Sequence, residues 1–319
     1  MPEGSAADLS RPRLGLALGA GAARGLAHIG ALRAMAEIGV RPAALAGCSI
    51  GAVVAASYAA GRLDRLETAM RGVSWLQVAR LVDLGMHGGL IDSVRLHDFL
   101  EDILGTDALE DLPLPVTVIA ADMVTGREVW LNRGSVIDAV SASIAMPGLF
   151  PPVRMQRRWL VDGAVVNPLP VSAVRAMDVD AICAVNLSGP LWRVPARELH
   201  PRASEAALPR LGWLAALTGR RGRAVRVEPL DTLCDPMHAG AAPGSLDVMS
   251  QSLTVMQDII ARMRLAGDPC DVLIAPDVRR IGLFQFDRAD ELIEAGHRAV
   301  AAERERLIEL VADETSRHP

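Results

Sequence analysis

The alternation of apolar and polar residues predicts short buried strands separated by helices along most of the chain. Apolar runs of strand length are bounded by Gly or Pro, and longer stretches repeat their apolar residues with helical spacing. We expect strands at 14–19, 43–46, 116–122, 127–131, 159–161, 181–185 and 272–275. We expect helices at 26–38, 52–60, 63–71, 94–104, 135–145, 246–265 and 289–311. Strands that alternate with helices favour an α/β fold with a largely parallel sheet covered on both faces.

The periodicity is lost between residues 188 and 245, where Pro, Gly and Arg are frequent. We interpret this stretch as a variable insertion or cap on a single domain of residues 13–312, with flexible termini at 1–12 and 313–319. Within the insertion, the stretch 209–226 begins with a short apolar helix at 209–218, which is followed by Arg220, Arg221, Arg223 and Arg226. Such a segment is a candidate for peripheral contact with a membrane, while a loop helix with a solvated basic tail is the alternative.

Composition narrows the functional classes. The chain has 319 residues, a net charge of -5 and arginine as its only basic residue besides histidine, so a basic nucleic-acid-binding face is not expected and a lysine base is excluded. The four cysteines, Cys48, Cys183, Cys234 and Cys270, are widely spaced and suggest neither a disulfide framework nor a zinc site. No secretory pattern or long apolar run is present, which favours a protein of the reducing cytosol. No metal or organic cofactor is implied.

The five residues Gly47-Cys48-Ser49-Ile50-Gly51 lie between an expected strand and an expected helix. This is the pattern of a nucleophile elbow, in which two glycines permit a sharp turn that exposes the serine hydroxyl at a helix N-terminus. Ser49 is therefore a candidate nucleophile for acyl transfer. The alternative is a glycine-rich turn that only packs a helix against a strand.

A second glycine turn, Gly19-Ala20-Gly21-Ala22, follows the first expected strand. A dinucleotide-binding loop requires its third glycine at position 24, where this chain has Arg24, so that interpretation is a minor alternative. The backbone amides of Gly21 and Ala22 instead suit an oxyanion hole. A tight turn without a ligand remains the other possibility.

No histidine follows an expected strand in a loop, so a Ser-His-Asp triad is not predicted. The histidines are His28, His87, His97, His200, His238, His297 and His318. Asp162 directly follows the strand 159–161 and precedes Gly163, which permits a close approach. A free Asp, with a pKa near 3.9, is a poor base at neutral pH, but partial burial beside Ser49 would raise it. Asp162 is a candidate base, although Asp-Gly is also a common turn.

Four sequence blocks, taken in order, resemble the patatin-like phospholipase family, in particular its small bacterial members of the RssA and neuropathy-target-esterase-like type. The resemblance covers most of residues 13–187, and the closing helices are also similar. The blocks are Gly19-Ala-Gly-Ala-Ala-Arg-Gly-Leu-Ala-His-Ile-Gly30, Gly47-Cys-Ser-Ile-Gly51, Ser143-Ile-Ala-Met-Pro-Gly-Leu-Phe-Pro-Pro152 and Val161-Asp-Gly-Ala-Val-Val-Asn-Pro-Leu-Pro170.

The resemblance implies a three-layer α/β/α fold and a Ser49–Asp162 dyad that hydrolyses acyl esters of lipids without histidine or a cofactor. Alanine stands at several positions where the family commonly has glycine. One of them is Ala164, which follows Gly163 in the acid motif. Arg24 matches the family's basic loop residue, which either meets a phosphate or forms a structural ion pair. The implied oxyanion loop comprises Gly19, Ala20, Gly21, Ala22, Arg24 and Gly25. A rival hypothesis is a catalytically silent regulatory or scaffold protein with the same fold.

Overall fold

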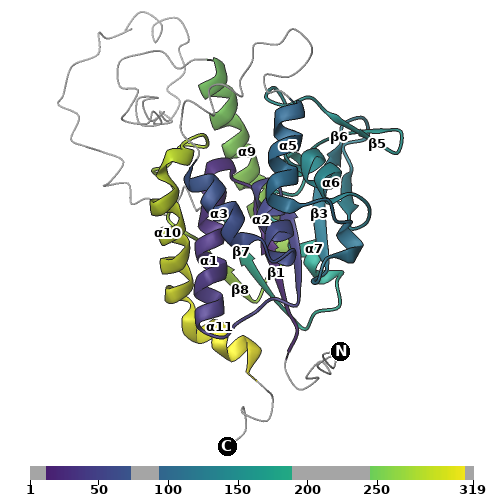
Figure 1. Cartoon of the computed structure of the whole chain (residues 1–319). Coiled ribbons are helices and arrows are strands. Elements are labelled where there is room, and N and C mark those ends of the chain that lie inside the picture. The colour runs from purple at the N-terminus through teal and green to yellow at the C-terminus, as the bar shows by residue number, and fades with distance from the viewer. Residues whose placement is uncertain (1–11, 73–92, 189–244, 313–319) are drawn as a thin grey trace, which may run out of the picture. The chain divides into compact units, whose positions relative to one another are not determined.

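The computed structural model describes residues 12–72, 93–188 and 245–312 (Figure 1). The chain divides into two compact units, one formed by residues 1–189 and 250–319 and the other by 190–249. Of the second unit, only residues 245–249, in the first turns of helix α9, are described. The expected cap at 188–245 therefore lies almost entirely outside the described residues.

The first unit is built on one eight-stranded sheet with the strand order β5-β6-β3-β2-β1-β7-β8, in which β4 also pairs with β3. The pairs β1–β2, β1–β7, β2–β3 and β7–β8 are parallel, whereas β4, β5 and β6 pair antiparallel. The strands are β1 (Leu14–Leu18), β2 (Ala44–Cys48), β3 (Val116–Asp122), β4 (Glu128–Leu131), β5 (Val153–Met155), β6 (Arg158–Asp162), β7 (Ala181–Val185) and β8 (Val272–Ile274).

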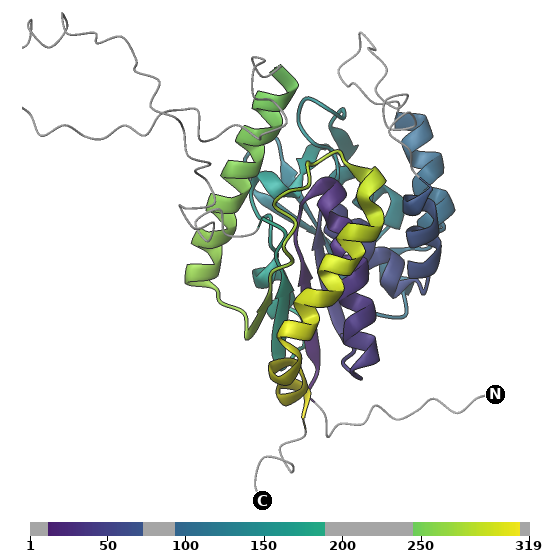
Figure 2. The ribbon, with the colours of Figure 1, turned by 90° about the vertical axis from the view of Figure 1, so that its left-hand side faces the viewer.

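Helices cover both faces of this sheet, as the two views show (Figure 2). The alternation along β1 explains the layers, because Leu16 and Leu18 pack into the large cluster under α1 and α10, while Ala17 packs into the smaller cluster beneath α7 and α9. The fold is thus the expected three-layer α/β/α arrangement. The helices are α1 (Leu26–Glu37), α2 (Ile50–Ala59), α3 (Leu63–Arg71), α5 (Ser93–Leu104), α6 (Val136–Ser143), α7 (Val171–Arg175), α9 (Ser245–Gly267), α10 (Ala289–Ala302) and α11 (Arg304–Val311).

Most predicted elements occur within two residues of their expected bounds, and the differences have local causes. The single helix expected at 289–311 is divided into α10 and α11 at Glu303, whose φ of -107° leaves the helical range. Strand β5 and helix α7 were not predicted, because three and five residues are too short to establish a period.

Helices α1 and α10, which lie side by side in one layer, approach closely through a glycine from each (Figure 1). A Cβ atom on Gly30 would lie 1.8 Å from the Ile293 carbonyl oxygen, and one on Gly296 would lie 1.9 Å from the Ala27 carbonyl oxygen. Only glycine fits at either contact, so the backbones can pack directly against each other.

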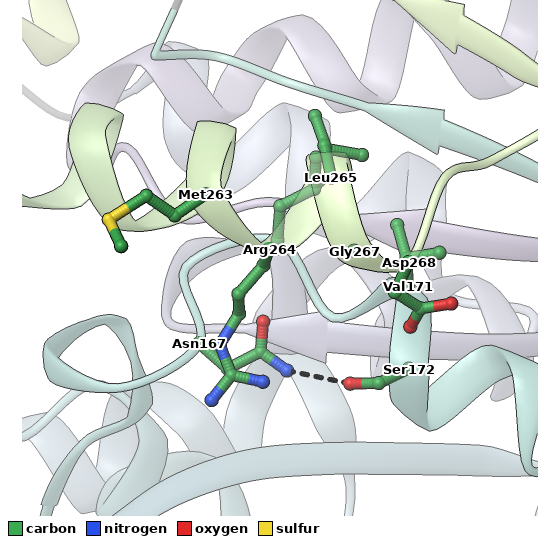
Figure 3. Close-up of a pocket in the computed structure, with 9 residues that line it drawn as sticks. Asn167, Val171, Ser172, Met263, Arg264, Leu265, Gly267 and Asp268 are labelled. Carbon is green, nitrogen blue, oxygen red and sulfur yellow. Dashed lines mark hydrogen bonds between the residues drawn. The ribbon is translucent and has the colours of Figure 1, made fainter.

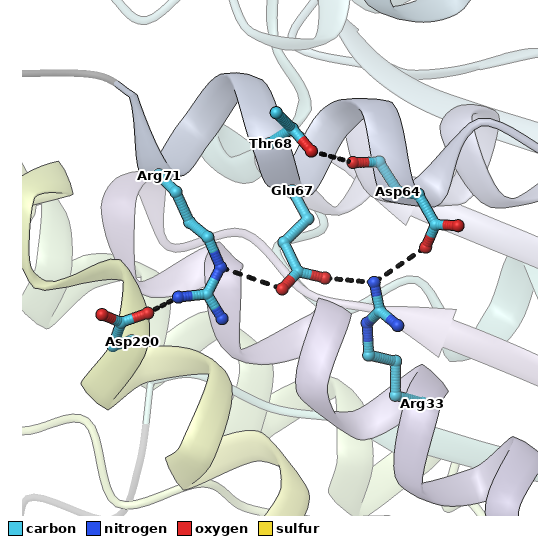
Figure 4. Close-up of polar contacts among 6 residues, drawn as sticks. All are labelled: Arg33, Asp64, Glu67, Thr68, Arg71 and Asp290. Atoms are coloured by element: carbon cyan, nitrogen blue, oxygen red, sulfur yellow. Dashed lines mark hydrogen bonds and ion pairs between the residues drawn. The ribbon is translucent and has the colours of Figure 1, made fainter.

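A network of ion pairs joins α3 to both of these helices (Figure 4). Glu67 of α3 pairs with Arg33 of α1 and, at 2.9 Å, with Arg71 of its own helix, and Arg71 also pairs with Asp290 of α10. Asp64 accepts a second bond from Arg33 at 2.8 Å. Since Glu67 is mostly buried, while the two arginines are half exposed and the two aspartates almost fully exposed, the network fixes the packing of α3 more than it adds stability.

Candidate active site

Ser49 lies in a sharp turn between β2 and α2, as a nucleophile elbow requires. Its φ of 56° and ψ of -125° are strained for a residue other than glycine. Its two glycine neighbours allow the turn, because a Cβ on Gly47 would lie 2.4 Å from the Gly51 carbonyl oxygen, and one on Gly51 would lie 2.2 Å from the Leu18 carbonyl oxygen. The elbow residues Cys48 and Ile50 end β2 and begin α2.

The pairing of two strands with β3 brings Asp162 to Ser49. Strand β2 pairs with β3 as far as Ile119, and β6 begins pairing at Ala120, whose partner is Asp162. Strand β4 pairs with β3 across this junction, so β2 and β6 must share the opposite edge. Strand β6 thus arrives, antiparallel, where β2 turns away at Ser49.

The two side chains form a direct hydrogen bond. The Ser49 hydroxyl donates to Oδ2 of Asp162 at 2.7 Å, and Oδ1 of Asp162 accepts the Ala164 amide at 2.8 Å. Burial raises the pKa of Asp162 from its ordinary value of 3.8 to about 6, against the opposing effect of these two hydrogen bonds. A carboxylate with this pKa is a stronger base than a free Asp and is still largely ionised at neutral pH.

The C-terminal end of α6 holds both members of this pair. The Ser143 hydroxyl accepts a hydrogen bond from the Ser49 amide at 2.9 Å and donates one to the Ile119 carbonyl at 2.6 Å. Two residues later, the Ala145 carbonyl accepts the Asp162 amide at 2.9 Å. Sequence reasoning assigned no role to Ser143, because its contacts depend on how α6 packs against β3.

The glycine loop after β1 contains two amides suited to an incoming anion. The amides of Gly19 and Ala20 donate to the carbonyls of Val185 and Pro168. Among the described residues, the Gly21 and Ala22 amides have no hydrogen-bond acceptor. Ala22 has a φ of 48°, a left-handed conformation that is unusual for a residue other than glycine.

His28 supports this loop from α1. Its Nε2 donates a hydrogen bond of 2.8 Å to the Gly19 carbonyl, while Nδ1 has no partner among the described residues. Complete burial lowers the pKa of His28 to about 4, despite the Gly19 contact, so the ring is neutral at ordinary pH. Within the described residues its side-chain hydrogen bond goes to Gly19 and not to Ser49.

The other candidate groups do not contact the dyad or lie outside the described residues. Arg24 donates from Nε to the Ile281 carbonyl at 2.6 Å and forms no ion pair within the described ranges, and burial lowers its pKa. His297 bonds Glu37 at 2.8 Å on the surface of α10. The remaining histidines outside the described residues are His87, His200, His238 and His318, and His97 is exposed on α5.

A cavity of about 250 Å³ lies between α7 and the end of α9 (Figure 3). Asn167 lines it and donates to Ser172 at 3.1 Å and to Glu128 at 2.7 Å. Arg264, also in its wall, pairs with Glu128 at 3.1 Å. Neither Ser49 nor Asp162 lines this cavity, so it is separate from the dyad.

Metal and membrane features are few in the described ranges. The one group of potential metal ligands found there is His97, Asp98 and Glu101 on α5, all exposed. None of the described helices has the length and apolar character needed to cross a bilayer. The predicted membrane-contacting stretch, 209–226, lies outside the described residues.

Comparisons with known proteins agree on one family. Residues 16–175 match the model of the patatin-like phospholipases. An uncharacterised NTE family protein of Mycobacterium tuberculosis is 33% identical over 96% of this chain and 95% of its own length. Lysophospholipase NTE1 of Pyricularia oryzae is 27% identical over 89% of this chain but only 18% of its own length. The crystal structure of VipD from Legionella pneumophila shares the fold, with a TM-score of 0.51 at 13% identity, covering 94% of this chain and 67% of VipD.

Proposed function

This chain belongs to the patatin-like phospholipase family, and we propose that it is a serine hydrolase of lipid acyl esters with Ser49 as nucleophile and Asp162 as base. The observation that carries the proposal is the 2.7 Å hydrogen bond from the Ser49 hydroxyl to Asp162 Oδ2. Membership of the family supports a lipid ester as substrate and a role in lipid degradation.

The proposed reaction begins with attack of Ser49 Oγ on the ester carbonyl, while its proton moves to Asp162 Oδ2. The amides of Gly21 and Ala22 stabilise the negative charge that develops on the carbonyl oxygen, and one such donor contributes about 3 kcal/mol to transition-state stabilisation. Asp162 then returns the proton to the departing alcohol, which leaves an acyl ester on Ser49. Water, activated by the same carboxylate, attacks this ester and releases the fatty acid.

The raised pKa of Asp162 supports its role as base. Proton transfer is most efficient when the pKa of the base approaches the working pH, and a value of about 6 meets that condition better than the ordinary 3.8. Ala164 limits the rise by donating to Oδ1, which also orients the carboxylate so that Oδ2 faces Ser49.

The substrate is proposed only as a class. A relative named as a lysophospholipase supports a phospholipid or lysophospholipid ester, but this chain spans 18% of that relative. A carboxylic ester of a fatty acyl chain is the feature that phospholipase A, lysophospholipase and carboxylesterase activities share. The proposed chemistry uses neither a metal nor an organic cofactor.

The alternative is a silent member of the family that binds a partner without turnover. It is favoured by one observation, since only 6% of Ser49 is exposed. An ester could not reach a hydroxyl that stays covered, whatever its hydrogen bonds.

Hydrolysis of p-nitrophenyl esters of graded chain length separates these proposals. We expect Ser49→Ala and Asp162→Asn to abolish turnover, whereas His297→Ala, a surface change, leaves it intact. A fluorophosphonate probe should label wild type but not Ser49→Ala, which identifies the reactive serine. Failure of wild type both to hydrolyse the esters and lysophospholipid and to react with the probe would favour the silent protein.

A further inference from the structure

Two neighbouring turns carry exposed apolar side chains beyond the end of β3. The β3–β4 turn leaves Met123 and Val124 exposed by 55% and 77%, and Trp159 at the start of β6 is 42% exposed. The Met123 amide donates to the Trp159 carbonyl at 2.9 Å, so the two turns are adjacent. Large apolar side chains that gather on a surface are typical of an interaction site.

Three exposed arginines lie in the same region, although the chain as a whole carries a net charge of -5. Arg154, Arg157 and Arg158 are exposed on the β5–β6 hairpin, and residues 139–161 include no acidic residue. No ion pair joins these arginines to the described part of the chain, but the buried carboxylate of Asp122, at the end of β3, lies close enough to Arg158 for the two charges to interact. Arg154 instead lies over the ring of Trp159, with its guanidinium carbon 5.8 Å from the ring centre.

We propose that these six residues form a docking rim for an anionic lipid bilayer. The rim comprises Met123, Val124, Arg154, Arg157, Arg158 and Trp159. Arginines attract anionic headgroups, and Trp prefers the boundary between headgroups and acyl chains, where Met and Val also lose contact with water. The choice of a lipid surface as partner rests on the proposed lipid hydrolase function, whereas docking itself requires no turnover.

The position of the rim fits this partner. Strand β6 runs from the exposed Trp159 to Asp162, three residues further on, so the dyad lies about 10 Å from the rim along an extended strand. Apolar anchors of peripheral proteins enter a bilayer by roughly 5–10 Å. A docked rim would therefore hold the dyad near the headgroup layer, where the acyl esters of phospholipids lie.

Co-sedimentation with vesicles tests the rim in a Ser49→Ala background, which prevents hydrolysis of the lipid. We expect this parent to bind mixed phosphatidylcholine–phosphatidylglycerol vesicles more strongly than phosphatidylcholine vesicles, and less so at high salt. At about 5-fold per arginine, Arg157→Gln/Arg158→Gln should lower the partition coefficient roughly 25-fold. Val124→Asp, at the exposed turn tip, should also lower it.

Arg41→Gln/Arg304→Gln is the matched control, because it removes the same charge from exposed positions. Arg41 precedes β2 at the end of the sheet opposite Ser49, and Arg304 begins α11. This control should bind vesicles as the parent does. An equal loss in both pairs, or no binding by the parent, would overturn the rim.

Two further measurements distinguish lipid docking from RNA binding and from the proposed ester hydrolysis. If the rim variants lose binding to single-stranded RNA but keep vesicle binding, the lipid assignment is wrong. Turnover of a soluble ester by wild type reports on the hydrolase alone. Vesicle binding that is lost only in the rim variants, with no ester turnover by wild type, would sustain the rim and reject the hydrolase, and the reverse pattern would do the opposite.

Discussion

The Ser143 hydroxyl accepts the amide of Ser49 at 2.9 Å and so fixes the backbone of the candidate nucleophile. It also donates to Ile119 on β3, next to the residue that pairs with Asp162. The spacing of the dyad therefore depends on a third side chain that belongs to neither strand of the dyad. This makes Ser143 a positioning residue in the proposed reaction.

We expect Ser143→Ala to lower kcat on the order of 10- to 100-fold, because a small displacement of a nucleophile is costly, while KM changes little. Two buried groups would lose their partner, which costs roughly 1–3 kcal/mol of stability. Ser57→Ala is the control, since Ser57 is equally buried and its hydroxyl has no partner among the described residues. If Ser143→Ala loses stability but keeps its kcat far below the melting temperature, its role is only structural.

The pKa of Asp162 predicts a pH dependence of ester hydrolysis. The carboxylate must be ionised to accept the Ser49 proton, so kcat/KM should rise with pH and reach half its plateau near pH 6. Initial rates on a soluble ester between pH 4 and 8 measure this midpoint, a range of about two units on either side of the pKa. A midpoint near the ordinary Asp value of 3.8 would contradict burial as the cause.

His28 predicts a separate effect of pH on stability. Its pKa is about 4 in the folded chain and near 6.5 when unfolded, so the unfolded state binds a proton first as pH falls. The resulting contribution of His28 to the free energy of unfolding amounts to roughly 3 kcal/mol. It is complete above pH 6.5 and is lost progressively towards pH 4. Denaturation by urea at several pH values measures the loss.

The variant His28→Gln tests this assignment, because its amide can still donate to the Gly19 carbonyl but does not titrate. Its free energy of unfolding should fall less between pH 6.5 and 4 than that of wild type. His28→Leu leaves the carbonyl without a donor and should be less stable at every pH. Identical pH profiles for wild type and His28→Gln would exclude His28 as the titrating group.

The sequence was sufficient to predict the architecture and the candidate dyad, for physical reasons that particular residues illustrate. Buried strands such as Ala181–Val185 are continuous apolar runs, and Gly47 and Gly51 mark the elbow because a Cβ at either position would clash with backbone atoms. Ser49 follows β2 and Asp162 ends β6, so local patterns mark them as candidates, whereas their pairing as a dyad was implied only by the family resemblance.

The parts that the sequence did not predict depend on contacts between distant segments. The meeting of β2 and β6 on one edge of β3 is a matter of register, and nothing in the local pattern of Leu160 or Ala120 reveals it. The same holds for Ser143, which resembles any small helical residue until α6 packs. His28 is another example, because the sequence does not show which group accepts its hydrogen bond. Its role in supporting the glycine loop follows only from the contact with the Gly19 carbonyl.

The close contact between α1 and α10 predicts a strong effect of one methyl group. In Gly296→Ala the new Cβ would lie 1.9 Å from the Ala27 carbonyl oxygen, a rigid backbone atom, so the helices must separate. We expect a loss of at least about 2 kcal/mol, the usual cost of overpacking, although Ala is the better helix former by roughly 1 kcal/mol. Gly267→Ala at the end of α9 is the control, since its Cβ would meet nothing within 4 Å, and it should not destabilise the protein. Equal free energies of unfolding for the two variants would mean that α1 and α10 do not pack this closely.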